Sequence, residues 1–326
     1  MEMVKKLLII CSLVSVLFFN CARSKVPQDN SLNWNFELVS IFYHHLDLRA
    51  DDIWPGWNDN PNSLLLRDEN RDWLFNFDYQ VPDGFTVYGN KNISDTGIWI
   101  LEGHLTPVPL ASVWQVGDIW AAAIPMMEQF QIAVDRALGA GKVKIDEDLY
   151  LQTLFHEIFH SYQFNLTGGQ LGNIASFNEN KALEEIRANA GWYIQIAKEG
   201  KALYDILTAE NQIDIERVIN DFILLNNEHR ANYSENLRNY VDYIETIEGT
   251  AVYAGALMME NIKPGAKLEF LNSLKNLSKI TTGEREIIQT AGAAKALILD
   301  LIDPRWKVGF LENNKIISEK LITVSS

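Results

Sequence analysis

Hydrophobic and polar positions change their spacing near residue 125 of the chain. Before this point, short apolar or alternating runs are separated by Asp-Asn, Pro-Asp-Gly and Gly-Asn pairs, which favour strands joined by tight turns. One stretch differs, because the apolar residues of 35–47 fall on one face of a helix. Residues 35–125 are therefore predicted to form a strand-rich lobe that opens with a helix. The predicted strands are 64–66, 73–77, 85–88, 98–101 and 119–124.

From Met126 onward the apolar residues recur at helical spacing. Asp146 is a suitable N-cap for the second of these helices, and the acidic side chains just after it suit the positive end of the helix dipole. A strand-rich lobe followed by a mostly helical lobe, residues 126–326, is an α+β arrangement. The predicted helices are 126–138, 147–165, 180–199, 201–227, 233–262, 266–278, 285–302 and 314–322.

The start of the chain has the pattern of an export signal. Two lysines precede an apolar run over 7–19, which is shorter than the ~20 residues that a membrane-spanning helix needs. Cys21 follows, and the whole stretch resembles a bacterial lipoprotein signal, in which that cysteine becomes the acylated first residue. The alternative is an ordinary cleaved signal with a coincidental cysteine. We therefore predict a signal peptide at 1–20, a tether at 21–34 and a single domain over 35–326.

Charge and cysteine content narrow the partners and the location. The chain has 43 acidic and 28 basic side chains, and a surface of that balance repels nucleic acid and anionic lipid headgroups. The other cysteine, Cys11, lies inside the apolar run, so the mature chain has no internal disulfide and depends on its core. A lipid on Cys21, rather than a basic patch, would hold it in the bacterial cell envelope, at the outer membrane or the cell surface in preference to the inner membrane.

The segment His156-Glu157-Ile158-Phe159-His160 lies in the middle of the helix that Asp146 begins. Side chains at i and i+4 lie one turn apart on one face, so both imidazoles can reach one ion. Zinc held by two histidines and a carboxylate keeps a fourth position for water, and Glu157 is placed to take a proton from it. The alternative is a pair of hydrogen-bonded core histidines. The segment predicts a zinc site with His156 and His160 as ligands and Glu157 as general base.

Two glutamates are candidates for the third ligand. Glu248 falls inside an apolar helical stripe, where a carboxylate calls for a cation, and we expect Gly249 and Ala251 to let its helix approach the histidine-bearing helix closely. Glu185 has Asn189 one turn on as a possible partner, but it points away from the apolar stripe of its own predicted helix. Glu248 is preferred, with Glu185 as the alternative. The stripe around Glu248 consists of Leu237, Val241, Ile244, Ala251 and Gly255.

These residues carry a family resemblance. The segment 156–160 with a downstream glutamate resembles the gluzincin clan of zinc metallopeptidases, and 248–253 is similar to the E-G-x-A-x-Y segment that supplies the glutamate ligand in several of its families. Glu185 with Asn189 instead resembles the E-x-x-x-D arrangement of other members, in which the interval from the second histidine is commonly this short. The layout is also similar to a bacterial lipoprotein branch of the clan.

The resemblance implies a zincin-like fold, with the active-site helix beneath a sheet and an edge strand that binds an extended peptide. Residues 121–124 are the candidate edge strand; alternatively they form an ordinary core strand. No motif singles out a transition-state stabiliser among Tyr240, Tyr243, His229 and Arg230.

The combined prediction is a zinc-dependent metallopeptidase that hydrolyses peptide bonds with a zinc-activated water and Glu157 as general base. Its partners would be a peptide or protein substrate and, through the N-terminal lipid, a membrane. The alternative is a catalytically inactive surface-binding lipoprotein that keeps the metallopeptidase fold. An intact Glu157 favours catalysis, because a pseudoenzyme is expected to lose its base first.

Overall fold

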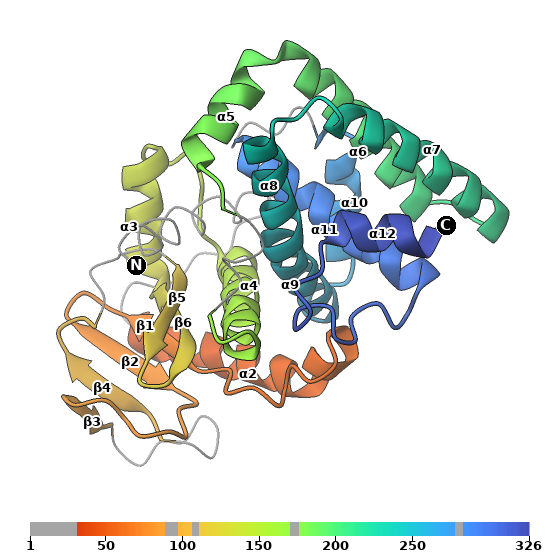
Figure 1. Cartoon of the computed structure of the whole chain (residues 1–326). Coiled ribbons are helices and arrows are strands. Elements are labelled where there is room, and N and C mark those ends of the chain that lie inside the picture. Colours follow the sequence, from red (N-terminus) through yellow and green to blue (C-terminus); the bar gives the residue numbers. More distant parts are fainter. Residues whose placement is uncertain (1–30, 89–96, 106–110, 170–175, 278–282, 326) are drawn as a thin grey trace. The chain divides into compact units, whose positions relative to one another are not determined.

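The computed structural model describes residues 31–88, 97–105, 111–169, 176–277 and 283–325 (Figure 1). The predicted signal peptide, Cys21 and the tether up to residue 30 lie outside the described residues. The α+β class is confirmed, with a six-stranded mixed sheet and many helices. Among the described residues, no helix combines the length and the apolar character needed to cross a membrane.

The chain divides into two compact units. The first comprises Met1–Gly169 with Leu257–Lys263, and the second comprises Gln170–Ala256 with Pro264–Ser326. The first contains the whole described sheet, and the second is built from helices in its described part.

The sheet of the first unit has the strand order β3-β4-β2-β1-β6-β5. The parallel pair is β1 with β6, and all the other pairs are antiparallel. The strands are β1 (Leu64–Arg67), β2 (Arg71–Phe75), β3 (Phe85–Val87), β4 (Trp99–Glu102), β5 (Ser112–Val116) and β6 (Ile119–Pro125).

The edge-strand prediction for residues 121–124 is wrong. These residues lie in β6, which is internal because β1 pairs with one side of it and β5 with the other. The sequence pattern did not predict β5, whose Trp114 and Gln115 leave the strand only partly buried. A strand of small apolar residues has the same sequence pattern at the edge of a sheet as in its interior. The position of β6 therefore depended on β5, the neighbouring strand that was not predicted.

Three helices of the first unit accompany the sheet: α2 (Ser31–Ile53), α3 (Met127–Leu138) and α4 (Glu147–Leu166). Helix α4 packs against β6 and is also in contact with α2 and β5. Asn165 fixes its last turn to the strand, since its side-chain amide accepts from the Trp120 N–H and donates to the Trp120 carbonyl, both at 2.8 Å. The helix expected over 147–165 is therefore present and is held against β6 and β5, at one end of the sheet.

The remaining helices are α5 (Glu179–Ala188), α6 (Ala190–Leu207), α7 (Gln212–Arg230), α8 (Glu235–Tyr243), η2 (Ile244–Glu248), α9 (Gly249–Ile262), α10 (Ala266–Leu274), α11 (Glu284–Ile302) and α12 (Ile317–Ser325). The single helix predicted over 180–199 is two helices. Asn189 separates them, and its side chain accepts a hydrogen bond from Gly191 N at the start of α6. Asparagine is a good N-cap, so it ends one helix and begins the next.

The helix predicted over 233–262 is continuous in direction but contains a π-helical turn, η2. This turn and the first residue of α9, Gly249, pack closely against α11 at Gly292. A Cβ on Gly292 would lie 2.2 Å from the carbonyl oxygen of Glu245, and a Cβ on Gly249 would lie 2.8 Å from Gly292 Cα. Only glycine fits at this contact. The expectation that Gly249 faces the histidine-bearing helix is therefore wrong, because it faces α11.

Candidate metal centre

Helix α4 carries the His-Glu-x-x-His segment in a fully enclosed position. Its start is capped as expected, with the Asp146 side chain accepting from Leu149 N at 3.0 Å. Every residue from Leu149 to Phe164 is buried, so the helix is a core element rather than an amphipathic surface helix. Packing around this buried stretch therefore fixes the position of the α4 backbone.

Aromatic side chains just after α2 support α4 beside the two histidines. The rings of Trp54 and Trp57 contact the Phe159 ring, with centroids 5.1 and 4.8 Å apart. The Tyr162 hydroxyl donates to the carbonyl of Pro55. The Trp-Pro-Gly-Trp segment therefore braces the stretch of α4 that contains His156 and His160.

The two imidazoles face each other with their outer nitrogens together. His156 Nε2 and His160 Nε2 are 2.9 Å apart, and the side chains are 3% and 6% exposed. His160 Nδ1 is 2.6 Å from Oε1 of Gln163, a buried residue one turn on. A carbonyl oxygen only accepts, so Nδ1 of His160 carries the proton and its Nε2 offers a lone pair. Gln163 thus sets the tautomer that a metal-binding histidine needs.

Glu157 lies between the two histidines in the sequence and is 2% exposed. Its backbone position on α4 is as firmly packed as theirs. A carboxylate next to two imidazoles in a buried helix has the chemistry of a proton acceptor, provided that a reacting water is present.

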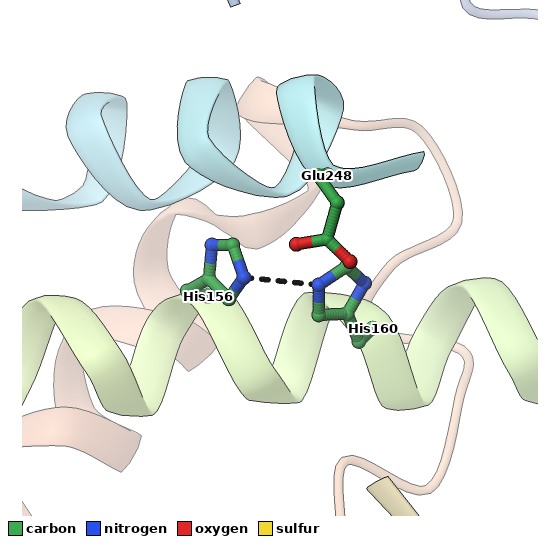
Figure 2. A group of neighbouring side chains, drawn as sticks. All are labelled: His156, His160 and Glu248. Carbon is green, nitrogen blue, oxygen red and sulfur yellow. Dashed lines mark hydrogen bonds between the residues drawn. The ribbon is translucent and has the colours of Figure 1, made fainter. Parts of the chain in front are cut away.

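Glu248 is the last residue of η2 and is 3% exposed. One ligand atom from each of His156, His160 and Glu248 lies within 4.8 Å of the others, and this buried group could hold a metal ion. Figure 2 shows the Glu248 carboxylate pointing toward the two imidazole rings. Irregular π turns in helices occur frequently at functional sites, and this one ends at the carboxylate.

Glu185, the alternative third ligand, binds Ser234 instead. Its Oε1 accepts from Ser234 N at 3.0 Å and its Oε2 accepts from the Ser234 hydroxyl. Ser234 is the N-cap of α8, so Glu185 joins α5 to the start of α8. Its predicted partner Asn189 instead caps α6. The structure therefore brings Glu248, and not Glu185, to the histidines.

Sequence reasoning missed the arginine beside Glu248. The guanidinium of Arg285, on α11, lies with Nη2 3.0 Å from Glu248 Oε1, and its Nη1 donates to Glu179 Oε1 at 3.0 Å. The Tyr240 hydroxyl also donates to Glu179, at 3.2 Å. All four side chains are buried. An arginine near a helix start has no motif of its own, so only the fold identifies it.

The other residues considered near the site belong to separate clusters. His229 binds Glu199 at 2.5 Å and contacts the Tyr233 hydroxyl. Arg230 pairs with Asp242 and Glu245. These contacts give His229 and Arg230 structural partners within the helical unit.

The donor set fits a zinc ion. Two nitrogens on a tetrahedral zinc at ~2.0–2.1 Å are roughly 3.3 Å apart, so the imidazole pair at 2.9 Å needs to open by only a few tenths of an ångström. Two neutral imidazoles and one carboxylate are also the ligands of catalytic zinc sites, which keep one position open. Comparison with protein-family models, curated proteins and solved structures gave no match. Any assignment of function therefore depends on the site residues.

Proposed function

We propose that this protein is a zinc-dependent peptidase, with His156, His160 and Glu248 as metal ligands and Glu157 as general base. The observation that carries the proposal is the buried group of two histidines and one glutamate, with a second glutamate between the histidines in the sequence. The resemblance of segments 156–160 and 248–253 to the gluzincin clan supports the same reaction. The zincin-like fold and the peptide substrate are also part of this proposal.

When bound, the zinc would act as a Lewis acid toward a carbonyl and lower the pKa of a water. The chain's own residues do the rest. Gln163 holds His160 with its proton on Nδ1, which directs the lone pair of Nε2 to the ligand side. Glu157 accepts the proton of the attacking water and returns it to the leaving amine. Burial of these groups strengthens each of these electrostatic interactions.

The test combines metal content with a single substitution. Purified protein refolded with zinc should hold about one zinc per chain. Glu157→Gln should keep the zinc and lower the rate of peptide cleavage by roughly 10²–10⁴-fold, the contribution typical of a general base. The matched control is Glu147→Gln, the same chemical change in the first turn of the same helix.

Three outcomes are informative. Zinc-free protein after zinc-replete refolding would overturn the metal assignment. Cleavage that survives Glu157→Gln would overturn the role of the base. Stoichiometric zinc without cleavage of any peptide in a diverse library would favour an inactive binding protein that keeps the metal site.

A further inference from the structure

We propose that His104 and Asp72 form a pH-dependent fastening, which holds residues 103–105 against the β1–β2 hairpin most tightly when the His104 imidazole carries both of its protons. Residues 103–105 directly follow β4, and they and the hairpin belong to the first unit of the chain. The proposal does not rest on the metal group or on the proposed peptidase function, because the contacts that carry it involve no residue of that group.

Three consecutive residues after β4 bind the hairpin. Gly103, whose φ of +92° suits glycine, donates its N–H to the carbonyl of Asn70 at 2.8 Å. Nδ1 of His104 lies 3.0 Å from Oδ1 of Asp72, and the N–H of Leu105 donates to Oδ2 of the same carboxylate at 2.6 Å. Asp72 therefore holds this segment through one side chain and one backbone amide.

The hairpin side of the fastening is buried and well connected. Asp72 is completely buried, and Arg67 on β1 donates from Nε to its Oδ1 at 3.0 Å. Asp68 closes the turn between the two strands, since its Oδ1 accepts from two backbone N–H groups of that turn at 2.7 and 2.8 Å. The His104 side chain, by contrast, is 33% exposed. Protons from the solvent therefore reach the pair at His104.

The surroundings of the imidazole distinguish its two charge states. Nδ1 faces the Asp72 carboxylate, and Nε2 lies 3.4 Å from the carbonyl oxygen of Glu69. Both partners can only accept, so a ring with two protons can donate to both of them, whereas a neutral ring can donate to one. The doubly protonated ring also forms an ion pair with Asp72. Because an imidazole changes its charge between about pH 5 and 8, acidification over this range strengthens the fastening.

Other charged groups lie on the elements next to the pair. Arg67 on β1 shares the carboxylate of Asp72 and opposes a second positive charge there. Asp68 and Glu69 lie in the turn between β1 and β2, and Glu102 on β4 is paired with an arginine of β2 at 2.9 Å. Carboxylates and guanidinium groups ordinarily keep their charge between pH 5 and 8. These groups therefore set the strength of the fastening, and the imidazole sets its dependence on pH.

The experiment follows hydrogen exchange of the Leu105 amide in the full chain, because this N–H donates to Asp72 beside His104. The protection factor corrects for the intrinsic effect of pH on exchange. It should fall by about 3–10-fold between pH 5 and 8, the size expected from the loss of one hydrogen bond. The ¹⁵N chemical shifts of the His104 ring, recorded on the same samples, should change with the same midpoint as the protection of Leu105.

Two variants assign the effect to one residue. His104→Gln removes the titrating group but keeps a side chain that can donate to Asp72, so its Leu105 protection should be equal at pH 5 and pH 8. His44→Gln is the matched control, because it makes the same change at an exposed histidine of α2. It should keep the full pH dependence of the parent.

Two results would overturn the proposal. The first is Leu105 protection that stays constant between pH 5 and 8 in the parent, a measurement that needs no variant. The second is a pH dependence that persists in folded His104→Gln, because another titrating group would then be responsible. A loss of the dependence in His104→Gln together with its retention in His44→Gln supports the proposal.

Discussion

Glu245 and Glu248 lie three residues apart on the same π turn and are equally buried, at 3% exposure each, yet their surroundings are opposite. Glu245 is saturated within the helical unit. Lys295 binds its Oε1 at 2.5 Å, and Ser318 and Arg230 bind its Oε2 at 2.6 and 3.3 Å. Glu248 has Arg285 at 3.0 Å from its Oε1, and its carboxylate points toward two imidazoles.

The difference teaches how to tell a structural carboxylate from a ligand. Burial alone would raise the pKa of Glu245, but the charges of Lys295 and Arg230 hold it below its ordinary value. The side chains of Arg230, Lys295 and Ser318 contact both oxygens of Glu245, and these contacts link η2 to α7, α11 and α12. The group around Glu248 brings two imidazoles and a carboxylate together, and these are ligand types that suit a divalent metal.

The largest expected effect comes from breaking the saturated cluster. Lys295 is completely buried, so Lys295→Met should lower the free energy of unfolding by about 3 kcal/mol, because Glu245 loses its closest cation. Denaturant unfolding of the metal-free protein measures this. Lys275→Met, at a lysine that lies over the Tyr204 ring, is the control. An unchanged unfolding free energy in Lys295→Met would show that the buried pair contributes no net stability.

The second effect separates the two candidate ligands. Glu248→Gln should weaken zinc binding by roughly 100-fold or more, beyond the 10–100-fold typical of an outer partner, while Glu185→Gln should leave zinc binding unchanged. Glu185→Gln should instead weaken the junction with Ser234 and lower thermal stability. Competition with a metal chelator measures the affinities. Equal zinc affinity in both variants would exclude Glu248 as a ligand.

Part of the fold and of the candidate site could be predicted from the sequence. The spacing of His156 and His160, the cap at Asp146 and the carboxylate of Glu248 inside an apolar stripe are local patterns. The helix and its cap are present, and the three side chains form a buried group that could hold a metal ion. The α+β class followed from the change in hydrophobic spacing near residue 125.

The rest depends on contacts between distant segments. Arg285 and Glu179 are far apart in the chain, and nothing near either residue indicates their pairing. Gly249 and Gly292 are informative only as a pair, because each lacks a Cβ at the point where the backbone of the other helix lies. The internal position of β6 likewise depends on β5, a strand with a weak pattern of its own. Periodicity reports which face is buried, and not which element buries it.

A third buried carboxylate extends the comparison to the case with no cation. Glu286, on α11, is 1% exposed, and neither of its carboxylate oxygens makes a hydrogen bond to the residues that the structure describes. Burial raises the pKa of Glu286 to about 9. It is therefore neutral in the folded protein at pH 7 and charged in the unfolded chain, whereas Glu245 is charged in both.

The smallest expected effect follows from that proton. Between an unfolded pKa of 4.5 and a folded pKa of about 9, the folded state binds the extra proton. The stability that Glu286 contributes is complete below pH 4.5 and is lost as the pH rises to about 9, at no more than about 1.4 kcal/mol per pH unit. Glu286→Gln removes this dependence, so the variant should match the parent near pH 4.5 and exceed it at pH 7 by on the order of 2 kcal/mol.

Denaturant unfolding at several pH values gives the two profiles. If they run parallel, Glu286 is ionised in the folded protein and must share a cation, which would place it with Glu245. If they diverge with rising pH, Glu286 is a buried acid that stays neutral in the folded protein, in contrast to Glu245, which Lys295 and Arg230 keep charged.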